Sequence, residues 1–156
     1  MSFKLSKRSM SRLEGVREDL HSTVLKAIQL SRCDFGVSCG VRSIEEQKAL
    51  LAKGASQTMA SKHLIQDDGY SHAVDLICYI AGRVSWEVNL YDDIADAMKE
   101  AADELDVGIV WGAAWHIKDL RNFEGTMEDA MNEYIDLRRS QGRRPFIDGP
   151  HFQLSE

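Results

Sequence analysis

One stretch of this chain decides its fold: residues 73–80 read Ala73-Val74-Asp75-Leu76-Ile77-Cys78-Tyr79-Ile80. Asp75 is its one charged residue, and the others are mostly the apolar and aromatic residues that β-strands favour. The pattern predicts a strand buried in a sheet, with a single carboxylate near its beginning. Because a strand is a rigid support for a functional side chain, Asp75 is the first candidate site residue.

The segments around this strand predict helices and further short strands. Apolar residues recur at helical spacing in several places, and Ser43 with Glu46 three residues later forms a capping-box pattern. Residues 55–71 are rich in Ser, Gly, Gln and Asp and predict a loop. We expect helices at 16–30, 43–53, 90–105 and 126–139 (the last as a third long helix or as an arm of an inserted helical hairpin), and strands at 34–39, 108–111 and 151–154. The fold expected is α+β, with helices packed on a small, mostly antiparallel sheet.

Composition and charge narrow the class of protein. The chain has 156 residues, 44% hydrophobic and 28% charged, which suits one globular domain over residues 1–156. A formal net charge of −6 argues against broad binding to nucleic acid. No apolar run has the length of a membrane span, and the basic N-terminus lacks the apolar stretch of a secretory signal. We therefore expect no membrane insertion and synthesis without a signal peptide.

The cysteines and the basic clusters predict structural rather than binding roles. Cys33, Cys39 and Cys78 form no CxxC pair and are odd in number, which argues against a disulfide framework. Cys39 and Cys78 fall in predicted strands, where a thiol acts as a small buried hydrophobic group. The basic clusters at 4–12 and 138–144 are interpreted as solvated helix faces or termini.

Three side chains are of the types that hold a catalytic zinc ion. His63, Asp75 and His151 could supply two imidazoles and a carboxylate, leaving a fourth position open for water. Asp148, three residues before His151, is placed to accept a proton from that water. Taken singly, a histidine is more often structural, and Asp148 before Gly149-Pro150 also suits a turn. The separation of twelve residues between His63 and Asp75 matches no generic zinc motif.

Longer motifs carry a resemblance to a known family. Ser61-Lys62-His63-Leu64 followed by His72-Ala73-Val74-Asp75-Leu76 resembles the S-x-H-x-x-G-x-A-x-D signature of the D-alanyl-D-alanine metallopeptidase superfamily, which includes VanY-type carboxypeptidases. Asp148-Gly149-Pro150-His151-Phe152-Gln153-Leu154 is similar to its closing motif, with an acidic residue three positions before the last ligand. With the Gly40-Val41-Arg42-Ser43 turn, the order of elements looks most like the phage L-alanyl-D-glutamate peptidases, which are single-domain endolysins.

The chain departs from the family pattern in one loop. The family places its first histidine seven residues before the aspartate, with a glycine between them. Here residues 65–70 form an insertion, and Ser71 stands where the glycine is expected. An insertion costs little if both of its ends stay in place. We therefore expect His63 as the first ligand, with His72 as the alternative, although His72 and Asp75 would face opposite sides of an extended strand.

Other residues receive provisional roles. Arg42 is a candidate for binding a substrate carboxylate, as related enzymes carry an Arg in this turn, or else is a solvated surface residue. Ser61 is expected to hydrogen-bond the substrate or to orient the neighbouring ligand, or else to be an ordinary polar loop residue. Trp111 and Trp115 could line the cleft, with a core position equally expected for Trp111. Asp67 and Asp68 could bind Ca²⁺, but solvated loop charges are the simpler interpretation. His21 and His116 are left outside the site.

The resemblance implies a function. It implies a zinc endopeptidase that cuts the L-alanyl-D-glutamate bond in the stem peptides of bacterial peptidoglycan and so lyses the cell. It also implies synthesis in the host cytoplasm and passage to the wall in the periplasm through a holin. We expect a monomer, because nothing in the sequence suggests more, and no separate wall-binding domain. The alternatives are a D,D- or L,D-carboxypeptidase that remodels the wall and a non-catalytic zinc-binding module of the same fold.

Overall fold

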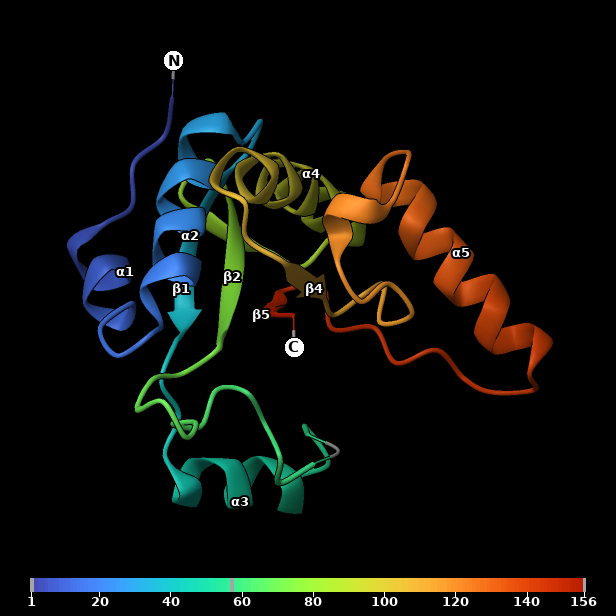
Figure 1. Ribbon diagram of the computed structural model, residues 1–156, viewed down its shortest axis with the longest axis horizontal. Coiled ribbons are helices and arrows are strands. Elements are labelled where there is room, and N and C mark those ends of the chain that lie inside the picture. The colour runs from blue at the N-terminus through green and yellow to red at the C-terminus, as the bar shows by residue number, and fades with distance from the viewer. Residues whose placement is uncertain (1, 57, 156) are drawn as a thin grey trace.

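The computed structural model describes residues 2–56 and 58–155 as helices and strands joined by ordered loops (Figure 1). The elements in chain order are α1 (Lys7–Arg12), α2 (Glu18–Leu30), β1 (Asp34–Cys39), α3 (Ile44–Ala52), β2 (Ala73–Ile80), β3 (Arg83–Ser85), α4 (Val88–Leu105), β4 (Ile109–Trp111), the 3-10 helix η1 (Leu120–Asn122), α5 (Met127–Ser140) and β5 (His151–Leu154). The α+β class expected from the sequence is confirmed.

The sheet is antiparallel throughout and is built around β2. Its strands lie in the order β1-β2-β5-β4, and β3 pairs with the end of β2. The residues that predicted a buried strand therefore form its centre, with the predicted bounds of Ala73–Ile80. Because β5 comes from the far end of the chain, this pairing brings His151 next to Asp75.

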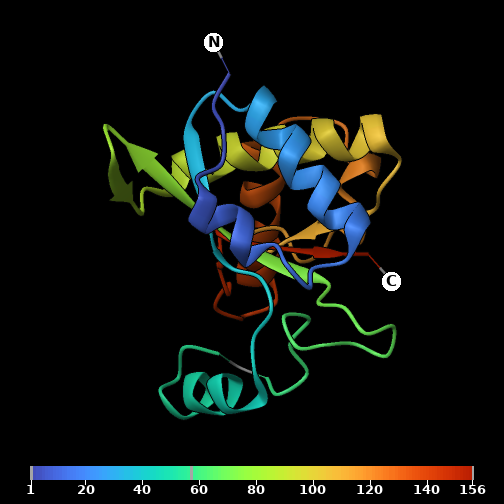
Figure 2. The same ribbon diagram turned by 90° about the vertical axis from the view of Figure 1, so that its left-hand side faces the viewer.

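Helices α2 and α4 pack against each other on one side of the sheet (Figure 2). They supply most of the helical residues of the hydrophobic core. Leu20 and Val24 of α2 and Ile94 and Met98 of α4 are fully buried. They belong to one hydrophobic cluster with sheet residues such as Phe35, Leu76 and Phe152. Burying these side chains stabilises the sheet by the hydrophobic effect, and it fixes the strand ends that carry the site.

Helix α3 and the loop that follows it are attached differently. Both views show them standing apart from the sheet, below it in Figures 1 and 2. Gln47 is the one buried residue of α3, whose apolar residues Ile44 and Leu51 are exposed. Ser43 and Glu46 form the predicted capping box at its start. This part of the molecule is thus held by polar contacts more than by a hydrophobic core.

Three short elements were not predicted from the sequence. Helix α1 occupies the basic cluster at 4–12, where the Ser6 side chain caps it by accepting from the Ser9 backbone N–H. Ser9 is buried, and Arg12 donates to the Val37 carbonyl at 3.0 Å, so this segment packs against β1 and is more than a solvated terminus. Strand β3 and the 3-10 helix η1 are the other two.

Two helices also depart from their predicted form. Helix α2 begins at Glu18 rather than at residue 16, because Val16 forms a β-bridge with Ser71. The segment predicted as a helix or a hairpin arm is the single helix α5. In the described parts of the chain, no helix has both the length and the apolar character required to cross a bilayer.

Candidate active site

Three neighbouring strands place Cys39, Asp75 and His151 in one row. Asp75 of β2 pairs with His151 of β5 on one side and with Cys39 of β1 on the other. The register of β1 shifts between Val37 and Cys39, and such bulges re-aim side chains at the edge of a site. Asp75 and His151 therefore meet at the rim of the sheet, as the sequence predicted for neighbouring strands.

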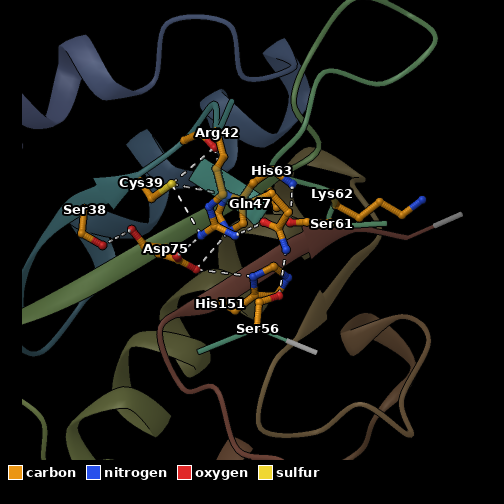
Figure 3. A network of polar contacts seen from close by, with 12 residues as sticks. Ser38, Cys39, Arg42, Gln47, Ser56, Ser61, Lys62, His63, Asp75 and His151 are labelled. Carbon is orange, nitrogen blue, oxygen red and sulfur yellow. Dashed lines mark hydrogen bonds and ion pairs between the residues drawn. The ribbon is translucent and has the colours of Figure 1, made fainter. Parts of the chain in front are cut away.

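His63 reaches this row from the loop after α3. Its ring is buried, and its Nε2 lies 3.1 Å from Asp75 Oδ1 (Figure 3). Its Nδ1 lies 2.8 Å from the Gly40 carbonyl oxygen, which can only accept, so Nδ1 carries the hydrogen. The His63 carbonyl accepts from the Arg42 backbone N–H at 2.9 Å. These contacts fix the ring with Nε2 directed at Asp75.

The insertion before Asp75 closes on itself. Ile65 and Ser71 form an antiparallel bridge, and the Gln66 backbone N–H donates to the Tyr70 carbonyl at 2.9 Å. The His72 backbone N–H then donates to the Lys62 carbonyl at 2.8 Å. The extra residues thus form a small hairpin, and its two ends, at Lys62 and His72, lie side by side. This geometry explains how His63 stands beside Asp75 despite the longer separation.

His151 faces Asp75 through its other ring nitrogen. Its Nδ1 lies 3.4 Å from Asp75 Oδ1, and its Nε2 lies 2.8 Å from Gln153 Oε1. The His63 and His151 rings meet edge to face, with centroids 5.1 Å apart. Two imidazole nitrogens thus converge on one carboxylate oxygen, while the other nitrogen of each ring has a protein acceptor.

This donor set fits a zinc ion. Zinc takes imidazole nitrogen and carboxylate oxygen, and zinc-binding histidines commonly donate their second ring N–H to a carbonyl or carboxylate. Gly40 and Gln153 supply these acceptors here. Among the described residues, the groups whose ligand atoms lie close enough to share a metal ion are Cys39, His63 and Asp75, and Asp75, Asp148 and His151. Both groups contain Asp75, so they describe one centre.

The charges of the centre also favour a cation. Burial opposes the charge of His63, but hydrogen bonds with Asp75 and Cys39 raise its pKa to about 10. Burial likewise opposes the charge of Asp75, yet hydrogen bonds from His151 and His63 lower its pKa. Both shifts have one cause, a carboxylate that draws positive charge toward it.

Asp148 lies at the same centre on the loop before β5. Burial raises the pKa of its carboxyl, and the negative charge of Asp75 raises it further. Its backbone N–H donates to the Gly112 carbonyl at 2.8 Å, and its own carbonyl accepts from the His151 N–H at 3.0 Å. A side chain at Gly112 would collide with the Asp148 carbonyl, so only glycine allows this close approach. Hydrogen bonds thus fix the backbone of Asp148, and the pKa of its carboxyl is raised.

These residues form the floor of a cavity of about 580 Å³. The other lining residues come from the turn before α3, from α3 and the loop after it, from the loops before η1 and β5, and from β5 itself: Arg42, Leu50, Ala55, Ser56, Thr58, Ala60, Ser61, Lys62, Trp115, Phe146 and Gln153. The volume is within the range of pockets that bind small ligands.

Arg42 is a cavity residue and not a solvated surface one. Its side chain is 12% exposed, with Nη2 3.3 Å from Asp75 Oδ2 and Nη1 2.8 Å from Gln47 Oε1. Gln47 in turn donates to Ser56 Oγ at 2.8 Å (Figure 3). It also donates to the Thr58 carbonyl at 2.5 Å. Ser61 Oγ accepts from the His63 backbone N–H at 3.2 Å, so it helps to orient that residue.

Several candidates lie elsewhere. His72 pairs with Asp68 at 2.7 Å on the insertion and is not among the described residues whose ligand atoms converge with those of Asp75. Asp68 also lies 3.7 Å from Arg17, and the calcium site considered at Asp67 and Asp68 stays a prediction. His116 pairs with Glu133 of α5 at 2.9 Å. Trp111 is fully buried in the core, whereas Trp115 lines the cavity.

Sequence reasoning missed three contributors. Cys39 was predicted to be a buried hydrophobic group, but it is partly exposed, and its Sγ lies 3.7 Å from His63 Nδ1 and 3.8 Å from Arg42 Nη2. Gln47 and Gln153 were not singled out. The one available signal was the spacing of Gln153 from His151, since residues two apart share a face of a strand.

Comparisons with known proteins agree with this geometry. The family described as phage L-alanyl-D-glutamate peptidase matches residues 1–155. The L-alanyl-D-glutamate peptidase of Escherichia phage T5 is 30% identical over 158 residues, which cover 99% of each chain. Among solved structures, the L-Ala D-Glu endopeptidase ChiX of Serratia marcescens matches with a TM-score of 0.71 and 32% identity, over 99% of this chain and 91% of that one. The chain belongs to the phage L-alanyl-D-glutamate peptidase family.

Proposed function

We propose that the protein is a zinc-dependent endolysin that hydrolyses the L-alanyl-D-glutamate bond of peptidoglycan stem peptides. The observation that carries this proposal is the convergence of His63 Nε2, Asp75 Oδ1 and His151 Nδ1 on the floor of a cavity, with Asp148 beside them. The bond specificity is supported by the names of the phage T5 and Serratia relatives.

In this proposal, His63, Asp75 and His151 hold the metal ion. When bound there, Zn²⁺ would polarise the scissile carbonyl and make a water molecule more acidic. The acceptors behind both histidines keep their rings in place, so the ligand atoms are arranged before the ion arrives. The negative charge of Asp75, which faces the two imidazoles in the structure, would then face the bound cation.

Asp148 would carry the proton through the reaction. Its carboxylate accepts a proton from the attacking water, whose oxygen bonds to the alanine carbonyl carbon. It then gives that proton to the nitrogen of D-glutamate as the C–N bond breaks. The raised pKa of Asp148 suits this second step, because a carboxyl that binds its proton more tightly persists longer as an acid.

Arg42 and Ser61 would act on the substrate side of the centre. Arg42 presents a guanidinium at the cavity wall, where it can pair with a substrate carboxylate. Ser61 holds the backbone of His63 and faces the cavity. We further propose that residues 1–156 act as one monomeric catalytic domain, made in the host cytoplasm and admitted to the periplasmic wall through a holin.

The test combines metal analysis with product analysis. The purified protein is expected to hold one zinc ion per chain and to release fragments from isolated peptidoglycan that expose a new N-terminal D-glutamate. It is also expected to lyse Gram-negative cells whose outer membrane has been permeabilised. Asp148→Asn should retain zinc and lose activity by about 10²–10⁴-fold. An active, zinc-loaded variant would remove Asp148 from the mechanism.

Two other outcomes would overturn the proposed endopeptidase function. Release of terminal D-alanine from free pentapeptide, with the L-alanyl-D-glutamate bond left intact, would indicate a carboxypeptidase. Zinc binding without any cleavage of peptidoglycan would indicate a non-catalytic module of the same fold.

A further inference from the structure

The two walls of the cavity differ in chemistry. On the side of α3 and its loop, the lining is small or polar apart from Leu50, and it includes Ser56, Ser61 and Arg42. The opposite wall presents the aromatic rings of Trp115 and Phe146 beside Asp148. A cleft with one polar and one aromatic wall distinguishes the two ends of a substrate that crosses it.

The aromatic wall is built as a unit. The Trp115 and Phe146 rings stack with centroids 6.3 Å apart and planes 22° apart. Trp115 Nε1 donates to the Phe146 carbonyl at 3.1 Å, which fixes one residue on the other. Phe146 remains 37% exposed, and the Trp115 ring lies 5.3 Å from that of His151. A rigid, partly exposed aromatic surface therefore borders the reacting centre.

The proposed substrate has a sugar close to the bond that is cut. In peptidoglycan the stem peptide starts with L-alanine, which an amide joins to the lactyl group of N-acetylmuramic acid. One extended residue spans at most about 3.6 Å, so the sugar lies only about two such lengths from the scissile carbon. On the other side, D-glutamate is linked onward through its side chain, which leaves its α-carboxylate free.

We propose that Trp115 and Phe146 form a glycan subsite that receives N-acetylmuramic acid. The apolar face of the sugar ring packs on the aromatic wall, and the D-glutamate carboxylate lies toward Arg42 on the polar wall. This orientation aligns the chain across His63, Asp75 and His151 with its sugar end on the side of Phe146. The inference rests on the proposed function, because it takes the L-alanyl-D-glutamate bond as the bond that is cut.

The experiment compares two substrates of the zinc-loaded enzyme. One is the stem peptide attached to the N-acetylglucosaminyl-N-acetylmuramic acid disaccharide, and the other is the same peptide with an acetyl group in place of the sugar. The wild type should prefer the first substrate in kcat/KM. Phe146→Leu and Trp115→Leu should each reduce this preference by about two- to tenfold, the range expected for loss of one aromatic contact.

The control variants separate a ring contact from a general loss of structure. Trp86 stacks on Tyr91 in a similar way, with centroids 6.4 Å apart, but it lies outside the cavity lining. Trp86→Leu should therefore keep the wild-type preference. Phe146→Tyr, which retains an aromatic ring, should keep most of it. Equal preference in the wild type and Phe146→Leu, or no preference in the wild type, would overturn the glycan subsite.

A direct binding measurement completes the test. The chain has three tryptophans, so its indole N–H groups give three resonances that single variants can assign. Titration of Asp148→Asn with the disaccharide peptide should displace the Trp115 resonance and leave that of Trp86 in place. An unmoved Trp115 resonance at saturation would contradict the subsite. A wild type that cleaves neither substrate would instead overturn the proposed function.

Discussion

The position of each imidazole is set by an acceptor behind it. His63 Nδ1 is held by the Gly40 carbonyl and His151 Nε2 by Gln153 Oε1, both at 2.8 Å. A histidine without such a partner could rotate about its side chain and lose its alignment with Asp75. His72 illustrates the contrast, since its Nε2 is directed at Asp68 on the insertion. The hydrogen-bond partners of His63 and His72 therefore explain why His63 lies beside Asp75 although His72 is closer to it in the sequence.

This contrast predicts different effects for two alanine substitutions. His63→Ala should weaken zinc binding by at least 10–100-fold, the loss typical of altering even a supporting partner of a ligand, and should abolish turnover. His72→Ala removes only a contact at the surface of the insertion and should leave zinc affinity within a factor of about two. Competition with a fluorescent zinc chelator measures both. The assignment fails if His72→Ala proves the more damaging change.

At the scale of elements, much of the sheet could be predicted from local sequence. The bounds of β1, β2 and β5 follow from short runs of strand-forming residues between turn signals. The pairing of Asp75 with His151 was expected only for neighbouring strands, and the observed register meets that condition. Helix α1 escaped prediction because six residues are too few for a periodic pattern.

The missed site residues depend on contacts between distant segments. Cys39 was assigned to the core by the apolar pattern of its strand, but the bulge in β1 against β2 turns it toward His63. Gln47 is the one buried residue of its helix, and its side chain donates to Ser56 Oγ and to the Thr58 carbonyl of the following loop. Local periodicity contains no information about either contact.

Gln47 is expected to hold α3 and its loop in place. Gln47→Leu removes the acceptor of Arg42 Nη1 and the donor to the Thr58 carbonyl, which should destabilise this region by about 1–3 kcal/mol. Hydrogen exchange should then become faster in α3 and the loop while remaining slow in α2 and α4. Gln29→Leu, at an exposed position of α2, is the matched control. Unchanged exchange in α3 would show that Gln47 does not anchor it.

Helix α4 contains a buried carboxyl that should weaken the fold at neutral pH. Asp92 is 4% exposed, and burial together with the charges of Asp93, Glu128 and Asp96 raises its pKa to about 6. Between about pH 4 and pH 6 the unfolded chain loses this proton first, so the wild type loses stability as the pH rises through that window. The penalty is absent below pH 4 and complete above the folded pKa.

Asp92→Asn should therefore be more stable than the wild type above pH 6. We expect a gain of about 1–3 kcal/mol, or about 2–12 °C in Tm, at pH 7.5 and little gain at pH 4. Thermal unfolding at both pH values measures it. Asp103→Asn, an exposed neighbour of Lys99 on the same helix, should give no comparable gain. A gain of equal size at both pH values would mean that ionisation of Asp92 is not its cause.

At the scale of the whole molecule, the centre joins two differently stabilised parts. Asp75 and His151 lie on the sheet that shares the hydrophobic core with α2 and α4. His63 belongs to the loop after α3, a region held by Gln47 and backbone hydrogen bonds. A metal ion bound by all three residues would cross-link the parts, so it should stabilise the loop as well as catalyse hydrolysis.

Metal removal should therefore lower the stability of the protein and loosen this loop first. At a free zinc concentration one hundred times Kd, binding to the folded state contributes about 2.7 kcal/mol, so chelation should lower Tm by about 5–11 °C. Hydrogen exchange should quicken around residues 58–64 before it does in the sheet. Asp75→Ala, which lacks the shared carboxylate, should unfold at the same temperature with and without chelator. A shift of equal size in that variant would place the stabilising ion elsewhere, and no shift in the wild type would mean that zinc does not join the two parts.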